Sequence, residues 1–285
     1  MLAVVLAVSA ALTYGASDFV GSVWSRRVGF IPVSIMAQSA SAIIALAALM
    51  ITVHTPPPAS VVGWGAAAGL GSAIGGLALF RGFQHGQIAV VAPLSALGAG
   101  AIPVVVGLAL GERPSIVAVL GVACALPAAW LVSSAQVSAA TLPEKEPEVT
   151  GVLDGLVAGV GFALLFIGLK EAGSGAGLWP VALQQLTALA LIGAVTLMAV
   201  ARSSGLVWSW ASAAGSALAG SLGAAAVLAY FVAAHTGLLA LVAVITSLYP
   251  AITVLLARLL LGERIGRRRQ VGLALAAIGV VLIAL

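Results

Sequence analysis

One pattern, Leu-x-Leu-Gly-Glu-Arg, is written twice in this chain, at 108–113 and again 151 residues later at 259–264. In each copy a glycine follows eight residues after the arginine, at Gly121 and at Gly272. In an apolar chain many Ala and Leu matches arise by chance, but a shared Gly-Glu-Arg with a shared downstream glycine is much harder to obtain. The chain is therefore a duplication, and we expect two halves built alike.

The composition determines the solvent of these halves. Hydrophobic residues make up 62% of the 285 and charged residues 7%, whereas soluble domains carry about 25% charged residues. Such a chain must be solvated by lipid. Its 12 Lys and Arg residues are scattered between apolar runs, so no basic face for nucleic acid is expected. The single cysteine, Cys124, excludes an intramolecular disulfide.

Stretches without charge delimit the expected helices, since about 20 apolar residues cross a bilayer. Two charge-free runs, 28–80 and 203–257, are long enough for two helices each, and both contain a break, at 54–58 and at 235–237. No Lys or Arg precedes the first apolar run, so we expect a retained helix from Leu2 rather than a secretory signal. The ten predicted spans are 2–23, 31–53, 61–81, 88–110, 115–135, 152–170, 178–201, 211–234, 238–261 and 267–285.

The fold class expected is an all-α membrane protein with ten transmembrane helices. Its predicted parts are a first five-helix repeat at 1–135, a polar linker at 136–151 and a second five-helix repeat at 152–285. Five spans per half is an odd number, so the second half enters the membrane upside down relative to the first. This predicts two inverted repeats, an architecture found in many secondary transporters.

The positive residues predict the orientation of the chain. The connections between consecutive spans are numbered from the N-terminus, so that connection 1 joins spans 1 and 2. The odd-numbered connections carry nine positive residues, and the even-numbered ones carry two, Arg113 and Lys170. We expect the protein in the cell (inner) membrane. Positive residues are retained on the cytoplasmic side, so the odd-numbered connections are predicted to lie in the cytoplasm and both termini outside. The nine residues are Arg26, Arg27, Arg81, Lys145, Arg202, Arg264, Arg267, Arg268 and Arg269.

The second half carries a run, 247–264, that is very similar to the second-repeat signature of the EamA family of the drug/metabolite transporter superfamily. Tyr14-Gly15 resembles the aromatic-glycine opening of the family's first repeat, and the stretch from Gly86 to Leu94 resembles its corner between the third and fourth helices. The resemblance covers nearly the whole chain. It implies export of a small metabolite, amino acid or drug-like solute by alternating access, through a central cavity. Many relatives are drawn with cytoplasmic termini, opposite to what the charges predict here.

The repeated turn is interpreted as a structural motif, made of Gly111, Glu112, Arg113, Gly262, Glu263 and Arg264. A carboxylate at the start of the following helix would complement that helix's dipole, and the arginine could pair with it or with a lipid phosphate. A direct role of the two glutamates in transport is the alternative.

Asp18 is the acidic candidate for function, because ionisable residues inside a membrane are costly. It either faces the cavity and binds a cationic group or a coupling proton, or it pairs with Arg26 or Arg27 near the helix end. The family resemblance suggests a cavity among helices 1, 3, 4, 6, 8 and 9. The candidates for substrate binding or cavity lining are Tyr14, Asp18, Gln38, Gln184, Tyr230, Ser247 and Tyr249.

The sequence lacks the motifs of several other classes of function. An ATP-binding Walker motif requires a glycine directly before its lysine, and neither lysine of this chain has one. No ATP and no other cofactor is therefore expected. The histidines have no metal-ligand spacing. Ser221 and His235 would be about 21 Å apart along one helix, too far for a hydrolase dyad. The expected partners are a small solute, the bilayer and a coupling proton. A scaffold or a channel-like protein stays open as an alternative.

Overall fold

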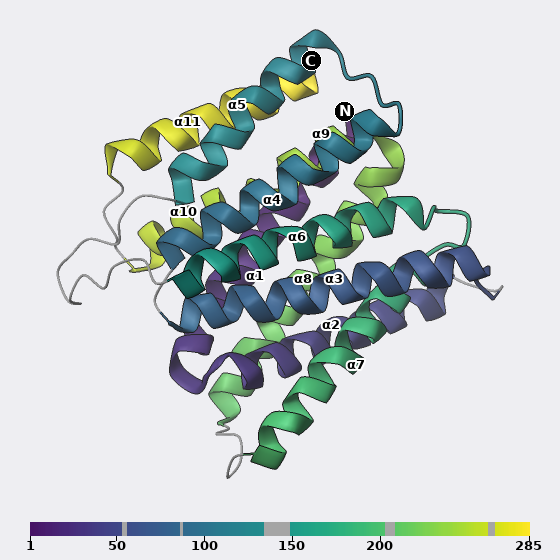
Figure 1. Cartoon of the computed structure of the whole chain (residues 1–285), viewed down its shortest axis with the longest axis vertical. Coiled ribbons are helices and arrows are strands. Elements are labelled where there is room, and N and C mark those ends of the chain that lie inside the picture. The colour runs from purple at the N-terminus through teal and green to yellow at the C-terminus, as the bar shows by residue number, and fades with distance from the viewer. Residues whose placement is uncertain (53–55, 86–87, 134–148, 203–208, 262–265) are drawn as a thin grey trace.

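The computed structural model describes residues 1–52, 56–85, 88–133, 149–202, 209–261 and 266–285. Within these ranges the chain is all α-helical (Figure 1). The helices are α1 (Leu2–Val28), α2 (Phe30–Thr52), α3 (Ala59–Gln84), α4 (Ile88–Ala109), α5 (Ile116–Ser133), α6 (Val149–Glu171), α7 (Trp179–Arg202), α8 (Trp210–Thr236), α9 (Leu239–Thr246), α10 (Tyr249–Leu261) and α11 (Arg267–Ala284).

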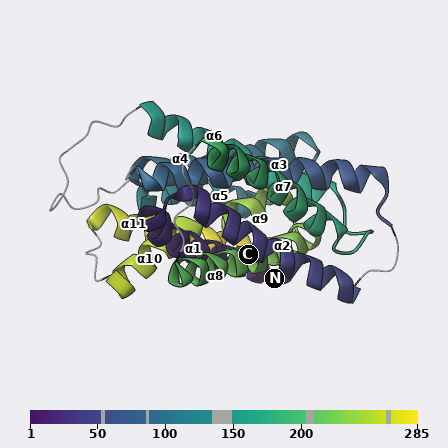
Figure 2. The ribbon, with the colours of Figure 1, turned by 90° about the horizontal axis from the view of Figure 1, so that it is seen from below.

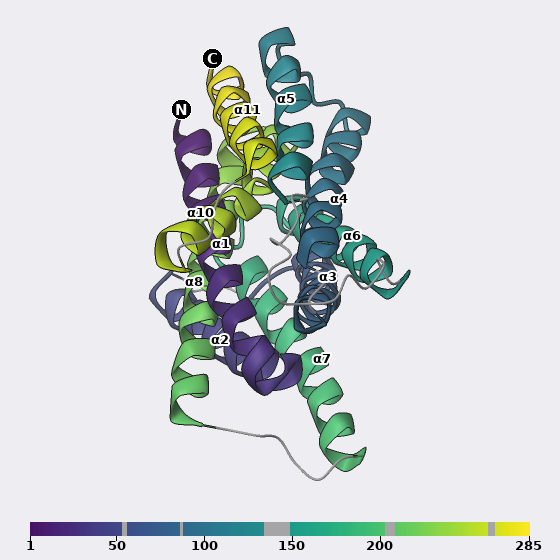
Figure 3. The same cartoon turned by 90° about the vertical axis from the view of Figure 1, so that its left-hand side faces the viewer.

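Seven of these helices are long and apolar enough to cross a membrane: α1, α2, α3, α4, α6, α7 and α8. The chain is thus a multi-pass membrane protein. The other predicted spans correspond to shorter helices, α5, the pair α9 and α10, and α11. Figures 1 and 3 place both termini at the same end of the molecule.

The ninth predicted span, 238–261, is wrong as a continuous helix. The structure ends α9 at Thr246 and begins α10 at Tyr249. Pro250 is the second residue of α10, where a missing N–H is tolerated but a preceding helix is not continued. The position one repeat earlier is Ala99, inside α4, and α4 is uninterrupted. The break therefore belongs to the second half only.

The first helix is longer than predicted, since α1 runs to Val28 rather than to residue 23. Arg26 and Arg27 lie in its last turn, where positive side chains complement the helix dipole. Gly29, with φ 91°, then reverses the chain directly into α2. As a result Asp18 lies ten residues before the helix end, about 15 Å along the axis, and so deeper than the sequence suggested.

The helices form two layers (Figure 2). In one layer α6 packs against α3 and α4, and α3 packs against α7. In the other layer α1 packs against α8 and α10, and α8 packs against α2. Each layer thus contains helices from both halves of the sequence. The halves are interleaved, and the space between the layers is bordered by both.

Glycines permit the close approach of helices within each layer. A Cβ atom at Gly15 in α1 would lie 2.5 Å from the carbonyl oxygen of Tyr249 in α10, and one at Gly98 in α4 would lie 2.7 Å from the Cα of Gly159 in α6. Small residues let backbones pack in lipid, where no hydrophobic force drives helices together. The glycine content of the sequence therefore supports the two-layer packing.

The repeated turn is described only in its first copy. Gly111, with φ 91°, lies in the turn after α4. The carboxylate of Glu112, which follows it, was predicted to cap the next helix, and this prediction is wrong. The start of α5 is instead served by Ser115, whose hydroxyl accepts from the N–H of Ala118 at 3.1 Å. Gly262, Glu263 and Arg264, and residues 136–148 of the predicted linker, lie outside the described residues.

Candidate functional site: a cavity between the two layers

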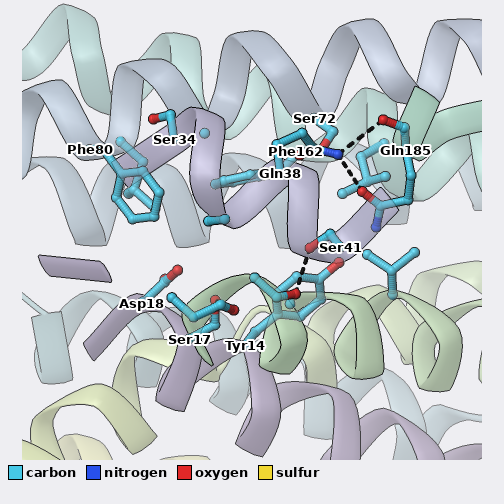
Figure 4. Close-up of a pocket in the computed structure, with 18 of the residues that line it drawn as sticks. Tyr14, Ser17, Asp18, Ser34, Gln38, Ser41, Ser72, Phe80, Phe162 and Gln185 are labelled. Carbon is cyan, nitrogen blue, oxygen red and sulfur yellow. Dashed lines mark hydrogen bonds between the residues drawn. The ribbon is translucent and has the colours of Figure 1, made fainter. Parts of the chain in front are cut away.

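A cavity of about 820 Å³, its open side included, lies between the layers (Figure 4). It is lined from α1, α2, α3, α6, α7, α8 and α10, and so from both halves. The lining residues are Tyr14, Ser17, Asp18, Ser34, Ala37, Gln38, Ser41, Ser72, Gly76, Leu79, Phe80, Phe162, Leu165, Phe166, Gln185, Ile192, Ala219, Gly220, Gly223, Val227 and Tyr249.

Asp18 is the single charged residue of this described lining. It is 9% exposed, and no hydrogen bond or ion pair of the described residues involves its carboxylate. The predicted alternative, a pair with Arg26 or Arg27, is absent from the described contacts; Arg27 instead lies over the ring of Trp24 at 5.1 Å. An isolated carboxylate away from bulk water is costly, so it is a group that a bound ligand can satisfy.

Several neutral polar groups share the lining. The amide of Gln38 donates to the backbone oxygen of Gln185 at 3.1 Å and to its side-chain oxygen at 2.5 Å. Ser17 and Ser41 donate to backbone oxygens of α8, at Ala219 and at Gly220. These hydrogen bonds fasten α1 and α2 to α7 and α8. The hydroxyls of Tyr14 and Ser34 are buried without a protein partner, which leaves two groups for a solute or water.

A cluster of aromatic side chains lies at one end of the cavity. The rings of Phe166 and Tyr230 stack with centroids 4.3 Å apart, and Tyr14 lies 6.2 Å from Phe166 and 6.3 Å from Tyr249. Tyr230 also donates its hydroxyl to the carbonyl of Phe166 at 3.1 Å. Such tilted and stacked pairs pack tightly. Since Phe166 lies five residues before the end of α6 and Tyr230 six before the end of α8, this cluster lies toward the side of the even-numbered connections.

The opposite end of the cavity reaches toward the odd-numbered connections. Ser34 lies four residues after α2 begins, and Phe80 lies four residues before α3 ends. At 1.5 Å per residue, both are about 6 Å from the helix ends on that side. The cavity is therefore asymmetric: shallow lining residues on the odd-numbered side, and packed aromatic rings on the even-numbered side.

The structure places the predicted candidates unequally. Tyr14, Asp18, Gln38 and Tyr249 line the cavity. Three others lie outside its lining.

Tyr230 is fully buried behind Phe166, and Ser247 donates to the carbonyl of Val244 at 2.8 Å in the break after α9. Gln184 is also fully buried, and its neighbour Gln185 lines the cavity instead. In a helix, adjacent residues are turned by about 100°, so only one of two neighbouring glutamines faces a given side.

The helix set predicted for the cavity also needs correction. Of the described residues, none from α4 lines it, and the ninth predicted span contributes only Tyr249, which lies in α10. Two helices outside the predicted set, α2 and α7, contribute Ser34, Gln38 and Gln185. The reason is the layer packing: α4 lies against α6 and α9, while α2 and α7 lie against each other. Helices α2 and α7 thus supply the amide pair, Gln38 and Gln185.

One ion pair, between Arg81 and Asp154, was not predicted from the sequence. Asp154 in α6 accepts from the guanidinium of Arg81 in α3, with the Asp154 side chain 3% and the Arg81 side chain 52% exposed. Asp154 lies near the start of a predicted span, and its acidity could have marked it as needing a partner. The partner itself could not be foreseen, because it lies 73 positions away on a helix of the other half.

The corner between α8 and α9 is held by two charged side chains, one from the turn after α4 and one from the end of α6. The carboxylate of Glu112 accepts from the N–H groups of Leu239 at 2.5 Å and Ala240 at 2.9 Å. The ammonium of Lys170, at the end of α6, donates to the carbonyls of Ala234 at 2.6 Å and Gly237 at 3.1 Å. Free N–H groups begin a helix and free carbonyls end one, so each charge meets the helix end it complements. Neither residue reaches the cavity.

The residues considered for enzymatic chemistry do not meet. The hydroxyl of Ser221 donates to Ala217 at 2.9 Å, and Nδ1 of His235 contacts the carbonyl of Phe231 at 2.8 Å, each within its own helix. In the described ranges no group of three or more His, Cys, Asp or Glu side chains could hold a metal ion.

These features define the class of this protein: an all-helical, multi-pass membrane protein with a buried polar cavity between two layers of helices. Residues 149–285 match the model of the EamA-like transporter family. A domain of this family implies a transporter of the drug/metabolite type, a group that is generally non-enzymatic. A comparison with curated proteins gave no match. Among solved structures, the crystal structure of one protein shares the fold over 98% of this chain and 95% of that chain, with a TM-score of 0.76 and 17% identity.

Proposed function

We propose that this protein is a secondary transporter that moves a small solute across the cell (inner) membrane by alternating access of the central cavity. The observation that carries the proposal is the cavity itself: it is lined from both halves, holds an unpartnered buried carboxylate and is lined by the aromatic ring of Phe166, which stacks on Tyr230. A carrier needs a site that faces one side at a time.

The packing of helices supports two inverted repeats as the basis of this movement. Helix α1 packs against α8 as α6 packs against α3, and α2 packs against α8 as α3 packs against α7. In the ten-span order, each helix has a counterpart five places away: α1 corresponds to α6, α2 to α7 and α3 to α8. Replacing each helix by its counterpart turns the α1–α8 contact into the α6–α3 contact, and the α2–α8 contact into the α7–α3 contact. A two-fold axis relating the halves produces this reciprocity, and the odd number of spans per half requires that axis to lie in the membrane plane.

In the proposed cycle the described conformation is open toward the odd-numbered connections, which the charge distribution assigns to the cytoplasm. Outward opening then requires the rings around Phe166 to separate and a corresponding contact to form near Phe80. Since the cavity loads from the cytoplasm, the proposed direction is export. Export and uptake are distinguished by the side of the membrane on which rising solute concentration saturates the transport rate.

The experiment is counterflow in liposomes with the purified full-length chain. A carrier preloaded with unlabelled solute accumulates the labelled solute transiently, because one site alternates between the two sides. A channel gives no overshoot and no saturation, and a scaffold gives neither flux nor overshoot. Screening a metabolite mixture by mass spectrometry supplies the solute, and Gly76→Leu, which fills the cavity, supplies the negative control.

A further inference from the structure

Resting on the transport function proposed above, we propose that the solute is an organic cation with an apolar or aromatic body, held at its charged end by Asp18. The cavity supplies one negative group, a set of hydroxyls, an amide pair and aromatic walls. Each of these has a counterpart in such a molecule.

Charge gives the first part of the inference. Asp18 lines the cavity and has no described protein partner, while the described lining contains no Lys, Arg or His. The nearby cations are otherwise engaged, Arg27 over Trp24 and Arg81 with Asp154. A carboxylate or phosphate on the solute would enter this space unpaired and beside a like charge, which is strongly unfavourable away from water. The cavity therefore discriminates against anions and against zwitterions such as free amino acids.

The walls give the second part. The ring of Phe80 lies against Gly21, three residues after Asp18 on α1: a Cβ atom built on Gly21 would be 2.7 Å from that ring. Tyr14, one helical turn before Asp18, lies on the same face of α1 and also lines the cavity. Aromatic faces attract ammonium groups through their electron-rich π-systems. Asp18 is thus flanked along its helix by two rings able to contact a cationic head and an apolar body.

The polar groups give the third part. In the view of Figure 4, Asp18, Ser34 and Phe80 lie toward one end and the Gln38–Gln185 pair toward the other. The amides of that pair can accept and donate hydrogen bonds but carry no charge. The end opposite the carboxylate thus suits a neutral polar substituent, such as a hydroxyl or an amide, and not an ionised one.

The test compares three probes that share one phenylethyl body: phenethyltrimethylammonium as the cation, 2-phenylethanol as the neutral alcohol and phenylalanine as the zwitterion. Binding to the full-length protein in detergent is measured by calorimetry. The cation is expected to bind most tightly. Asp18→Asn is expected to weaken cation binding at least about tenfold, since truncating one member of a buried charge pair removes most of its attraction, and to leave the alcohol unchanged. Glu171→Gln, an exposed carboxylate at the end of α6 and outside the lining, is the matched control.

Tighter binding of phenylalanine than of the cation, or unchanged cation binding by Asp18→Asn, overturns the proposal. If Asp18→Asn does not fold, Asp18→Glu, which keeps the charge, and the ranking of the three probes on the unmodified protein decide the question. Counterflow separates this proposal from the proposed function. Accumulation of phenylalanine without the cation keeps transport and rejects the solute class. Binding of the cation through Asp18 with no counterflow of any probe keeps the class and rejects transport.

Discussion

Glu112 and Leu239 are 127 positions apart, yet the carboxylate of the first accepts the N–H of the second at 2.5 Å. Leu238, which precedes α9, has no side chain able to cap it, so Glu112 from the other half of the chain supplies the cap. A carbon on Gly107 would lie 2.5 Å from this carboxylate, and the glycine leaves the space for it. The Gly-Glu-Arg turn thus joins the halves and does not cap its own next helix.

This contact predicts the effect of Glu112→Gln. The variant keeps one amide oxygen but loses the charge that complements the start of α9, so we expect a loss of about 0.3–1 kcal/mol, rising toward about 2 when partly buried. The measurement is thermal unfolding in detergent, with solute affinity unchanged. Arg113→Gln, whose side chain is exposed, is the control. Abolished transport with normal unfolding would instead place Glu112 in the transport mechanism. The same outcome is predicted for Glu263→Gln from the sequence repeat.

The Arg81–Asp154 pair predicts an asymmetric double-mutant cycle. Arg81→Gln leaves the buried Asp154 carboxylate without its partner and should destabilise strongly, since breaking a buried pair from one side costs about 3–5 kcal/mol. Asp154→Asn leaves only a half-exposed arginine, which can turn to water, and should cost less. The double variant should recover much of the loss. Equal costs of the two single changes would show that burial of the carboxylate does not govern the pair.

The cavity predicts a variant that blocks transport without unfolding. A Cβ atom at Gly76 meets nothing within 4 Å, and Gly76 lines the cavity. Gly76→Leu should therefore occupy solute space, lowering affinity while leaving the unfolding temperature unchanged or raised, because leucine favours helix. Gly63→Leu on the same helix, also in open space but outside the lining, is the control. Wild-type counterflow by Gly76→Leu would remove the cavity from the transport path.

The charge distribution predicts topology. Arg268, exposed at the start of α11, should be cytoplasmic and Leu285 external. In a Cys124→Ser background, a cysteine at each position is tested with a membrane-impermeant maleimide applied to intact cells. The cysteine at 285 should react and the one at 268 should be silent. The reverse pattern would invert the assignment and, with it, the side to which the described cavity opens.

Binding of a permanent cation at Asp18 predicts a pH dependence of one sign. Protonation of the carboxylate removes its charge, so affinity for phenethyltrimethylammonium should fall as pH is lowered, and Asp18→Asn should abolish that dependence. The other titratable groups of the described lining are Tyr14, on the same helix, and Tyr249 on α10, and neither gains a charge on acidification. Calorimetry across mildly acidic to mildly alkaline buffers measures this. Affinity that rises on acidification would exclude an ionised Asp18 as the anchor.

The sequence by itself determined the helical membrane architecture, because lipid requires long apolar helices and the duplication fixes their spacing. The repeat offset of 151 residues also relates the starts of α4 at Ile88 and α9 at Leu239. It singled out Asp18 too, since an ionisable group within an apolar span is conspicuous without any knowledge of its neighbours.

Only the tertiary structure decided what each polar group meets. The partner of Asp154 is Arg81, that of Glu112 is the start of α9, and that of Gln38 is Gln185 rather than Gln184. These contacts link residues 73 to 147 positions apart, across layers that each draw helices from both halves. A periodic pattern along the chain says which face of a helix is small or polar, but many apolar faces are interchangeable in lipid. Which faces meet is set by the close approach of backbones at glycines and by the pairing of the few buried charges.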